Sequence, residues 1–364
     1  MKATNLSTKL VLICVFGLSA ACAKLNFAPL SVEDQSAIVP VPAPSKTINS
    51  TEVVAYGNKQ VDFLLVLDDS NSMYPELAKL AARMSTFVSS LDASNIDWQM
   101  CLTTTRSYSS ADGPIFGTPL NWRNYAPASG TPGYLLKRGT ANLNTIFTTT
   151  VENLTIGGLG SADERAIKTT HDNFKSYAMG THNCYRPGAA ISVIVISDED
   201  ERSVGGDPQY VKPADASGAY IAFDSEDHPA AMIAQAKTSF GDDVRLTFNS
   251  IIVKPGDNIC EAEQDKDASP SHPGRVYAEA SRLTDGGIGS ICETDYSASL
   301  NTFKDKIVNS LSALNLQCEP EPKTLKVKVE GLEIGGLKLD GKALKFSFPL
   351  IEGTQIDLQY DCKE

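Results

Sequence analysis

The pattern of hydrophobic and polar positions divides the chain into a polar start, a long middle region and a short end. From Val61, continuous apolar runs alternate with segments in which apolar residues recur every three or four positions. Continuous runs are typical of strands buried on both faces, and the wider spacing is typical of amphipathic helices. The alternation predicts an α/β domain over residues 61–316, with a doubly wound, mostly parallel sheet flanked by helices.

Within this region, the apolar run Phe63–Leu67 has no polar interruption, so we expect it at the centre of the sheet. A helix is expected to follow from Pro75, with apolar residues on one face. Further strands are predicted at Trp98–Thr104, Ile191–Ile196, Leu246–Val253 and Gly289–Cys292, and further helices at Ala162–Tyr177, Pro229–Ser239, His272–Leu283 and Ser297–Leu314.

The two ends of the chain differ from the middle. Residues 22–60 have neither helical nor strand periodicity and include the proline-rich run VPVPAPSK, which is typical of a semi-extended tether. Residues 317–364 contain short alternating runs separated by glycine-rich turns, which predict a small β appendage.

The first 21 residues have the pattern of an export signal: Lys2 and Lys9 precede an apolar run that ends in small residues. This run is shorter than the roughly 20 residues that a membrane-spanning helix needs. The sequence before Cys22 resembles a bacterial lipobox, with Ser19 at the usual leucine position, which implies lipidation at Cys22. Ordinary cleavage after Ala23 is the alternative and would release a soluble protein. With lipidation, we expect an outer-membrane lipoprotein, facing the periplasm or the surface.

The composition is that of a soluble globular protein with a sizeable core, since 42% of residues are hydrophobic and 21% are charged. The formal net charge is -12. Binding to nucleic acid or to anionic lipid headgroups relies on clustered lysine and arginine, which this sequence lacks. We therefore expect no nucleic-acid partner, and membrane contact only through the N-terminal lipid.

Six cysteines follow Cys22 in the sequence, and an exported chain meets an oxidising compartment, so disulfides are expected. Six thiols allow about 15 pairings, and sequence proximity favours some of them. The favoured pairs are Cys260 with Cys292 and Cys318 with Cys362, which leaves Cys101 with Cys184. A zinc site is the alternative, but the paired cysteine and histidine spacings of such sites are missing.

A motif with metal-binding chemistry follows the first apolar strand. Asp68, Ser70 and Ser72 stand at the start of a strand-to-helix turn, and ligands in parallel sheets bind at the carboxyl ends of strands. One carboxylate and two hydroxyls suit magnesium, which prefers oxygen ligands and keeps several waters. The three residues match the DxSxS signature, and residues 61–316 resemble the von Willebrand factor A-type family, whose signature forms a metal-ion-dependent adhesion site.

This resemblance implies two more ligands. The family uses an aspartate at the end of the fourth strand, and Asp198 ends the apolar run Val193–Ile196 in a matching place. The family also uses a threonine from a preceding loop, and Ser161 retains the hydroxyl at that position. Ser161 together with Glu164 also matches a helix-capping box, which would explain the serine without a metal.

Two further features near the expected site have open interpretations. Glu199, Asp200 and Glu201 extend the acidic run, either as a solvated loop or as ligands of a second cation. Loops over residues 106–139 and 202–227 follow strands at the same edge of the sheet and could form a partner-binding rim. The first of these loops contains the aromatic residues Tyr108, Phe116, Trp122, Tyr125 and Tyr134.

Together these features predict a binding or adhesion module tethered to the bacterial cell envelope. Its divalent cation, magnesium before calcium or manganese, would accept an acidic side chain of a protein partner. The sequence lacks the GxSxG and HExxH motifs, so we expect no enzyme activity. A structural envelope protein stabilised by its metal is one alternative, and a hydrolase is another.

Overall fold

A computed structural model describes the chain from residue 46 onwards, with short gaps at residues 54–58, 111–112, 155–160, 162, 216–217, 243, 267–269, 312–313, 322, 347, 349, 351–352 and 364. The predicted export signal, Cys22 and the proline-rich part of the tether lie outside the described residues. Within the described part of the chain, no helix combines the length and apolar character that crossing a membrane requires.

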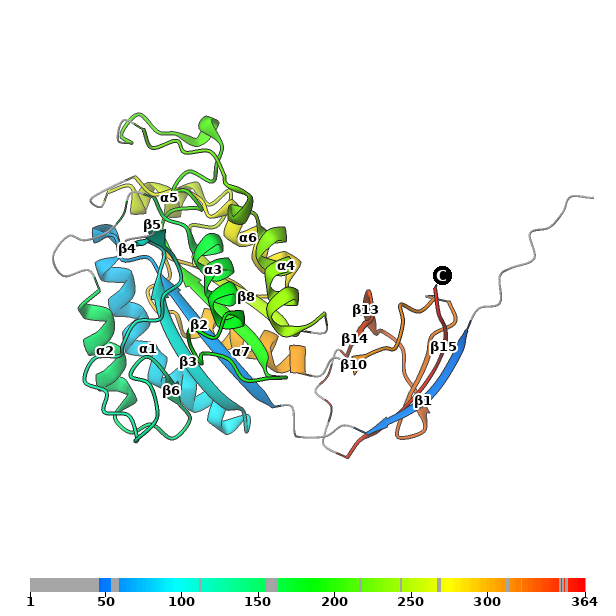
Figure 1. The fold of residues 1–364 in the computed structure, drawn as a ribbon. Coiled ribbons are helices and arrows are strands. Elements are labelled where there is room, and N and C mark those ends of the chain that lie inside the picture. The colour runs from blue at the N-terminus through cyan, green and yellow to red at the C-terminus, as the bar shows by residue number, and fades with distance from the viewer. Residues whose placement is uncertain are drawn as a thin grey trace, which may run out of the picture. The chain divides into compact units, whose positions relative to one another are not determined.

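The central sheet has six strands (Figure 1). Their order is β6 (Leu136–Lys137), β3 (Asp97–Thr104), β2 (Gln60–Leu67), β7 (Ala190–Ile196), β8 (Leu246–Ile252) and β9 (Ile288–Ser290). All neighbours are parallel except β6, which runs antiparallel to β3. The predicted mostly parallel sheet is confirmed, and the run Phe63–Leu67 lies in β2 at its centre. Leu67 pairs with Thr104 and Ile196, so three strands end at the same level.

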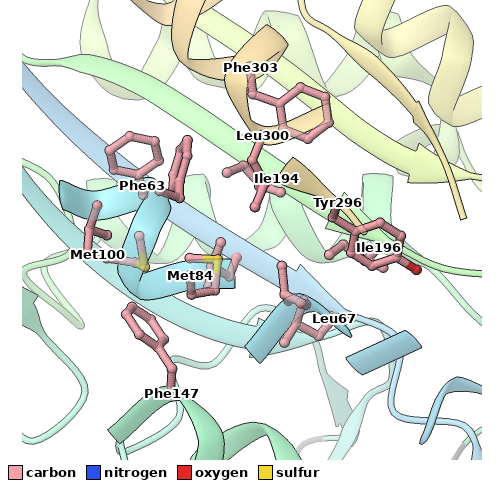
Figure 2. Close-up of a cluster of buried hydrophobic side chains, with 14 of the residues drawn as sticks. Phe63, Leu67, Met84, Met100, Phe147, Ile194, Ile196, Tyr296, Leu300 and Phe303 are labelled. Atoms are coloured by element: carbon pink, nitrogen blue, oxygen red, sulfur yellow. The ribbon is translucent and has the colours of Figure 1, made fainter. Parts of the chain in front are cut away.

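Helices cover both faces of this sheet. One face is packed against α1 (Tyr74–Ala93), α2 (Leu143–Glu152) and α7 (Ser297–Leu311), and the other against α3 (Ala166–Ala178), α4 (Pro229–Phe240) and α6 (Arg275–Leu283). Successive side chains of a strand point to opposite faces. Phe63 and Leu67 therefore join the first core, which Figure 2 shows, while Leu64 and Val66 join the second.

The elements expected from periodicity are all present, with shifted ends. The helix expected from Ala162 begins at Ala166, and the one expected from His272 begins at Arg275. Sequence periodicity missed several short features, among them strand β6, helix α2, helix α5 (Asn258–Gln264) and the hairpin of β4 (Tyr108–Ser110) with β5 (Gly113–Ile115). Each lies in a connection after a strand, where a short apolar pattern is hard to distinguish from a loop.

The end of the chain contains the predicted small strands in two sheets. One has the order β1 (Thr47–Val53), β15 (Gln355–Asp361), β11 (Lys326–Val329) and β12 (Leu332–Glu333), and the other has β10 (Leu314–Asn315), β14 (Ala343–Lys345) and β13 (Lys338–Asp340). The prediction of irregular tether up to residue 60 was wrong for β1, which pairs antiparallel with β15 along its whole length. Only Ile48 of β1 is buried, so its sequence gives little strand signal.

Three disulfides join the six predicted cysteines in the favoured pairing: Cys101 with Cys184, Cys260 with Cys292, and Cys318 with Cys362. The first connects β3 to the segment before β7, and the second connects α5 to the residues after β9. The third joins the ends of the small β region. Each therefore closes a long loop within one part of the fold.

Candidate metal-binding site

The candidate site lies at the carboxyl ends of β2, β3 and β7. Hydrogen bonding continues one residue past each strand, because Asp68 N donates to Ile196 O at 3.0 Å and Thr105 N donates to Leu67 O at 3.1 Å. Ser197 N likewise donates to Ile251 O at 3.2 Å. The side chains that follow the strands are thereby held at one edge of the sheet.

The turn after β2 is organised by the carboxylate of Asp68, which is fully buried. Its Oδ1 accepts a hydrogen bond from Ser70 N at 2.8 Å, and its Oδ2 accepts one from Ser197 Oγ at 2.7 Å. The hydroxyls of Ser70 and Ser72 lie 2.9 Å apart. The short 3-10 helix η2 (Asn71–Met73) then leads into α1. The turn therefore brings one carboxylate and two hydroxyls into a single buried cluster.

Asp198, the predicted ligand after β7, belongs to the same cluster. Asp198 is 1% exposed, and both the Ser72 hydroxyl and the charge of Asp68 act on the pKa of its carboxyl group. Neither oxygen has a hydrogen-bond partner in acceptable geometry among the described residues. A buried carboxylate without a partner is costly, and buried charges in proteins are normally paired or bound to a metal. The arrangement thus has the character of a cation site.

The electrostatics of the cluster give the same indication. Burial, followed by repulsion from Asp68 and Glu199, raises the pKa of Asp198 well above its usual range. Burial also raises the pKa of Asp68, and burial together with the charge of Asp68 raises the pKa of Glu199 to about 8. The charges that act most strongly on Asp198 are those of other carboxylates, which a bound cation would neutralise.

The acidic run after Asp198 is buried, so the interpretation as a solvated loop was wrong. Asp200 and Glu201 are fully buried, and each accepts two backbone N–H groups at a helix start. Asp200 binds the N–H groups of residues 275 and 276 in α6, at 3.0 and 3.1 Å. Glu201 binds the N–H groups of residues 167 and 168 in α3, at 2.8 and 3.0 Å. Both carboxylates therefore act as helix caps, and the N–H groups favour their charged forms. Burial outweighs these hydrogen bonds and raises the pKa of Asp200 to about 7 and the pKa of Glu201 well above its usual range.

The predicted capping box of Ser161 and Glu164 does not form, because Glu201 occupies the start of α3 instead. Ser161 Oγ accepts a hydrogen bond from Asp163 N at 3.0 Å and lies 3.3 Å from Asp163 O, within its own turn. These contacts do not join Ser161 to the cluster of Asp68, Ser70, Ser72 and Asp198. Its role as a metal ligand stays a prediction.

Glu164 is a site residue that sequence reasoning missed. Its side chain is fully buried, and its Oε2 accepts a short hydrogen bond from Thr105 Oγ1. Its Oε1 has no partner within the part of the chain that the structure describes. Burial and the charges of Asp68 and Glu199 raise its pKa well above the usual range. The sequence signal was ambiguous, because an acid three residues after a serine also fits a helix cap.

The long loop after β7 is fixed by buried ion pairs. Arg165 and Arg202 both bind Asp227, whose side chain is fully buried, at 2.6 and 3.0 Å. The exposed carboxylate of Asp224 joins both arginines, at 2.7 and 2.6 Å. The backbone of Arg202 and Ser203 adopts left-handed φ angles of 56° and 61°. Such conformations persist only where the surroundings enforce them, and they cluster at functional sites.

Two of the five aromatic residues of the first loop are not free to form a partner-binding rim. Phe116 and Trp122 are buried, the former against the Arg165 guanidinium and the latter against Phe147. The exposed apolar residues near this edge are instead Tyr74, Ile115, Tyr210, Val211, Tyr220 and Ile259. All of them belong to the connections that follow the carboxyl ends of strands β2, β3, β7 and β8.

In comparisons with known proteins, no family model matches the sequence, and no curated protein matches it. Among the described residues, no group of three or more Asp, Glu, His or Cys side chains is already arranged to hold a metal ion. The candidate ligands are instead a mixed set of two carboxylates and two hydroxyls. Their chemistry fits a divalent cation with oxygen ligands.

Proposed function

We propose that this chain is a cation-dependent binding protein of the von Willebrand factor A type. The observation that carries the proposal is the buried group of Asp68, Ser70, Ser72 and Asp198, in which neither carboxylate oxygen of Asp198 has a well-aligned hydrogen-bond partner among the described residues. The position of this group at the carboxyl ends of central parallel strands supports the proposal, because ligands of open α/β sheets bind there.

In this proposal Asp68, Ser70, Ser72 and Asp198 hold the cation, with Ser161 as a further candidate. Asp68 also keeps the turn closed through its bonds to Ser70 N and Ser197 Oγ. Two carboxylates balance the formal charge of a divalent ion and the hydroxyls add no further negative charge, and magnesium, calcium or manganese could be held by such ligands. When bound, the ion supplies an open coordination position for a partner's carboxylate.

The surroundings of the site support a protein partner. Exposed apolar residues such as Tyr74, Tyr210 and Ile259 follow the carboxyl ends of different strands, whereas Met179 and Leu283 lie at helix ends. Apolar side chains around a polar centre are typical of protein-binding surfaces. We propose that the partner presents an acidic side chain with apolar neighbours.

We further propose that the protein works outside the cytoplasm, anchored to the cell envelope through lipid on Cys22. Three disulfides fit an oxidising compartment. The resemblance of residues 19–22 to a lipobox supports the anchor. Release as a soluble secreted protein is the alternative that mass spectrometry of the mature N-terminus would identify.

The test uses two peptide libraries that differ only at a central position, Asp or Glu in one and Asn or Gln in the other. With magnesium or calcium present, the protein should retain acidic peptides, and chelator should release them. The Asp68→Ala variant should fold but retain neither library. Equal retention of both libraries, or retention unaffected by chelator, would contradict the proposal.

The same variant separates binding from a purely structural role of the metal. If the cation only stabilises the fold, Asp68→Ala should lower the melting temperature in magnesium while the wild type retains no acidic peptide. Melting curves with and without chelator make this comparison, since a ligand that binds only the folded state raises the melting temperature.

A further inference from the structure

Glu164 is held rigidly against the candidate site by its backbone. Its N–H donates to Ser203 Oγ at 3.3 Å, and its carbonyl accepts from Arg202 N at 2.6 Å. The next residue, Arg165, donates its N–H to Thr105 O at 3.1 Å. Glu164 is therefore clamped between the end of β3 and the left-handed turn after β7, two of the three strands that form the site.

The side chain of Glu164 has an unsatisfied oxygen in this position. The hydroxyl of Thr105 holds Oε2, which fixes the carboxylate, while the buried Oε1 has no partner among the described residues. The neighbouring charges that act on it most strongly belong to Asp68, Glu199 and Asp69, all of them acidic. Such a buried acid requires either a proton or a cation.

The hydroxyl that family resemblance assigns to this part of the site is engaged elsewhere. Ser161 Oγ is bonded within its own turn by Asp163. Ser161 is also partly exposed, whereas Glu164 is fully buried. Both residues belong to the segment that leads into α3, so the segment could contribute to the site through either one.

We propose that Glu164, rather than Ser161, completes the cation site, directly or through a water molecule, and that the site is selective for calcium. This inference rests on the proposed function. Glu164 raises the number of carboxylates near the ion to three, with Asp68 and Asp198. Calcium accepts six to eight oxygen ligands with several carboxylates in flexible geometry, whereas magnesium requires near-octahedral geometry and keeps most of its waters.

Mutual repulsion explains why the carboxylates of Glu164, Asp68 and Asp198 do not converge on one position. Three or more acidic side chains that converge on a metal are absent from the described residues, and the carboxylates repel one another. A cation removes this repulsion. The backbone of Glu164 is held on both sides, so its own adjustment towards a cation falls to its side chain.

The test is calorimetric titration of calcium and of magnesium into the full mature protein and its variants. Glu164→Gln keeps the size of the side chain and removes the charge, so it should weaken calcium binding at least tenfold and magnesium binding less. Ser161→Ala should bind both ions within about twofold of the wild type, as should Glu263→Gln, a control that neutralises an exposed acid. Unfolding curves in chelator confirm that each variant folds.

Different outcomes separate this inference from the proposed function. If Glu164→Gln binds calcium as the wild type does, while Asp68→Ala does not, the cation site stands and the role of Glu164 is refuted. Loss of binding in Ser161→Ala with retention in Glu164→Gln also refutes it. A folded wild type that binds neither cation overturns both proposals. Should Glu164→Gln fail to fold, Glu164→Asp, which keeps the charge but shortens its reach, should show the same selective loss of calcium affinity.

Discussion

Neutralising Glu199 should stabilise the metal-free protein, with a gain that grows as the pH rises. Glu199 is 7% exposed, and its Oε2 has no hydrogen-bond partner among the described residues. Burial, and then the charge of Asp68, raises its pKa from 4.5 to about 8. In the unfolded chain the Glu199 carboxyl group ionises near its ordinary pKa. At neutral pH, folding must therefore either protonate this group or bury its charge, and both cost free energy.

The size of the effect follows from this difference. Because the folded pKa is raised, the stability associated with Glu199 is fully present below about pH 4.5 and is lost as the pH rises towards about 8. Each pKa unit corresponds to about 1.4 kcal/mol, so between pH 4.5 and 7 the wild type loses about 3 kcal/mol. Glu199→Gln does not titrate and should keep that stability.

The assay is urea unfolding in chelator at several pH values between 4.5 and 8, which gives the free energy of unfolding at each pH. Glu199→Gln should equal the wild type near pH 4.5 and exceed it by about 3 kcal/mol at pH 7. Glu263→Gln, at a 63% exposed side chain, should match the wild type throughout. A difference for Glu199→Gln that stays constant across this range would refute the reasoning, because it would mean that burial does not raise the pKa of Glu199.

Three further predictions concern other parts of the structure. Replacing Cys260 and Cys292 with serine opens a loop of 32 residues and should lower the free energy of unfolding by about 4 kcal/mol, measured by urea unfolding. Asp227→Ala leaves Arg165 and Arg202 without their buried partner and should cost about 3 kcal/mol, whereas Asp224→Ala, at a 54% exposed carboxylate, should cost under about 1 kcal/mol. Cation binding should release protons and weaken as the pH falls, because burial and then Asp68 raise the pKa of Asp198; calorimetry in buffers of different ionisation enthalpy measures this release.

The parts of the fold that sequence predicted well are those in which local pattern and tertiary environment agree. The apolar run in β2 is continuous because both faces of the sheet are covered, and its central position follows from that burial. Asp68 and Asp198 could be singled out because each directly follows such a run, and parallel strands end at one edge. The disulfide pairing followed from proximity along the chain.

The missed features depend on partners that are distant in sequence. Strand β1 is ordered by pairing with β15, about 310 residues later, and shows little burial of its own. From sequence alone, Asp200 and Glu201 were interpreted as solvated acids. Their actual partners are backbone N–H groups at the starts of α6 and α3, which are distant in sequence. Glu164 matched a local capping pattern, but its contacts are with Thr105 and Ser203, which come from two other connections. Local spacing contains no information on such contacts.

The central claim is that Asp68, Ser70, Ser72 and Asp198 hold a divalent cation. Isothermal titration of magnesium, calcium and manganese into the mature protein, beside an Asp68→Ala and Ser70→Ala double variant, tests it most directly. The account predicts saturable binding to the wild type and none to the variant, while circular dichroism shows that the variant remains folded. Absence of binding to the folded wild type, or undiminished binding to the variant, would contradict the account.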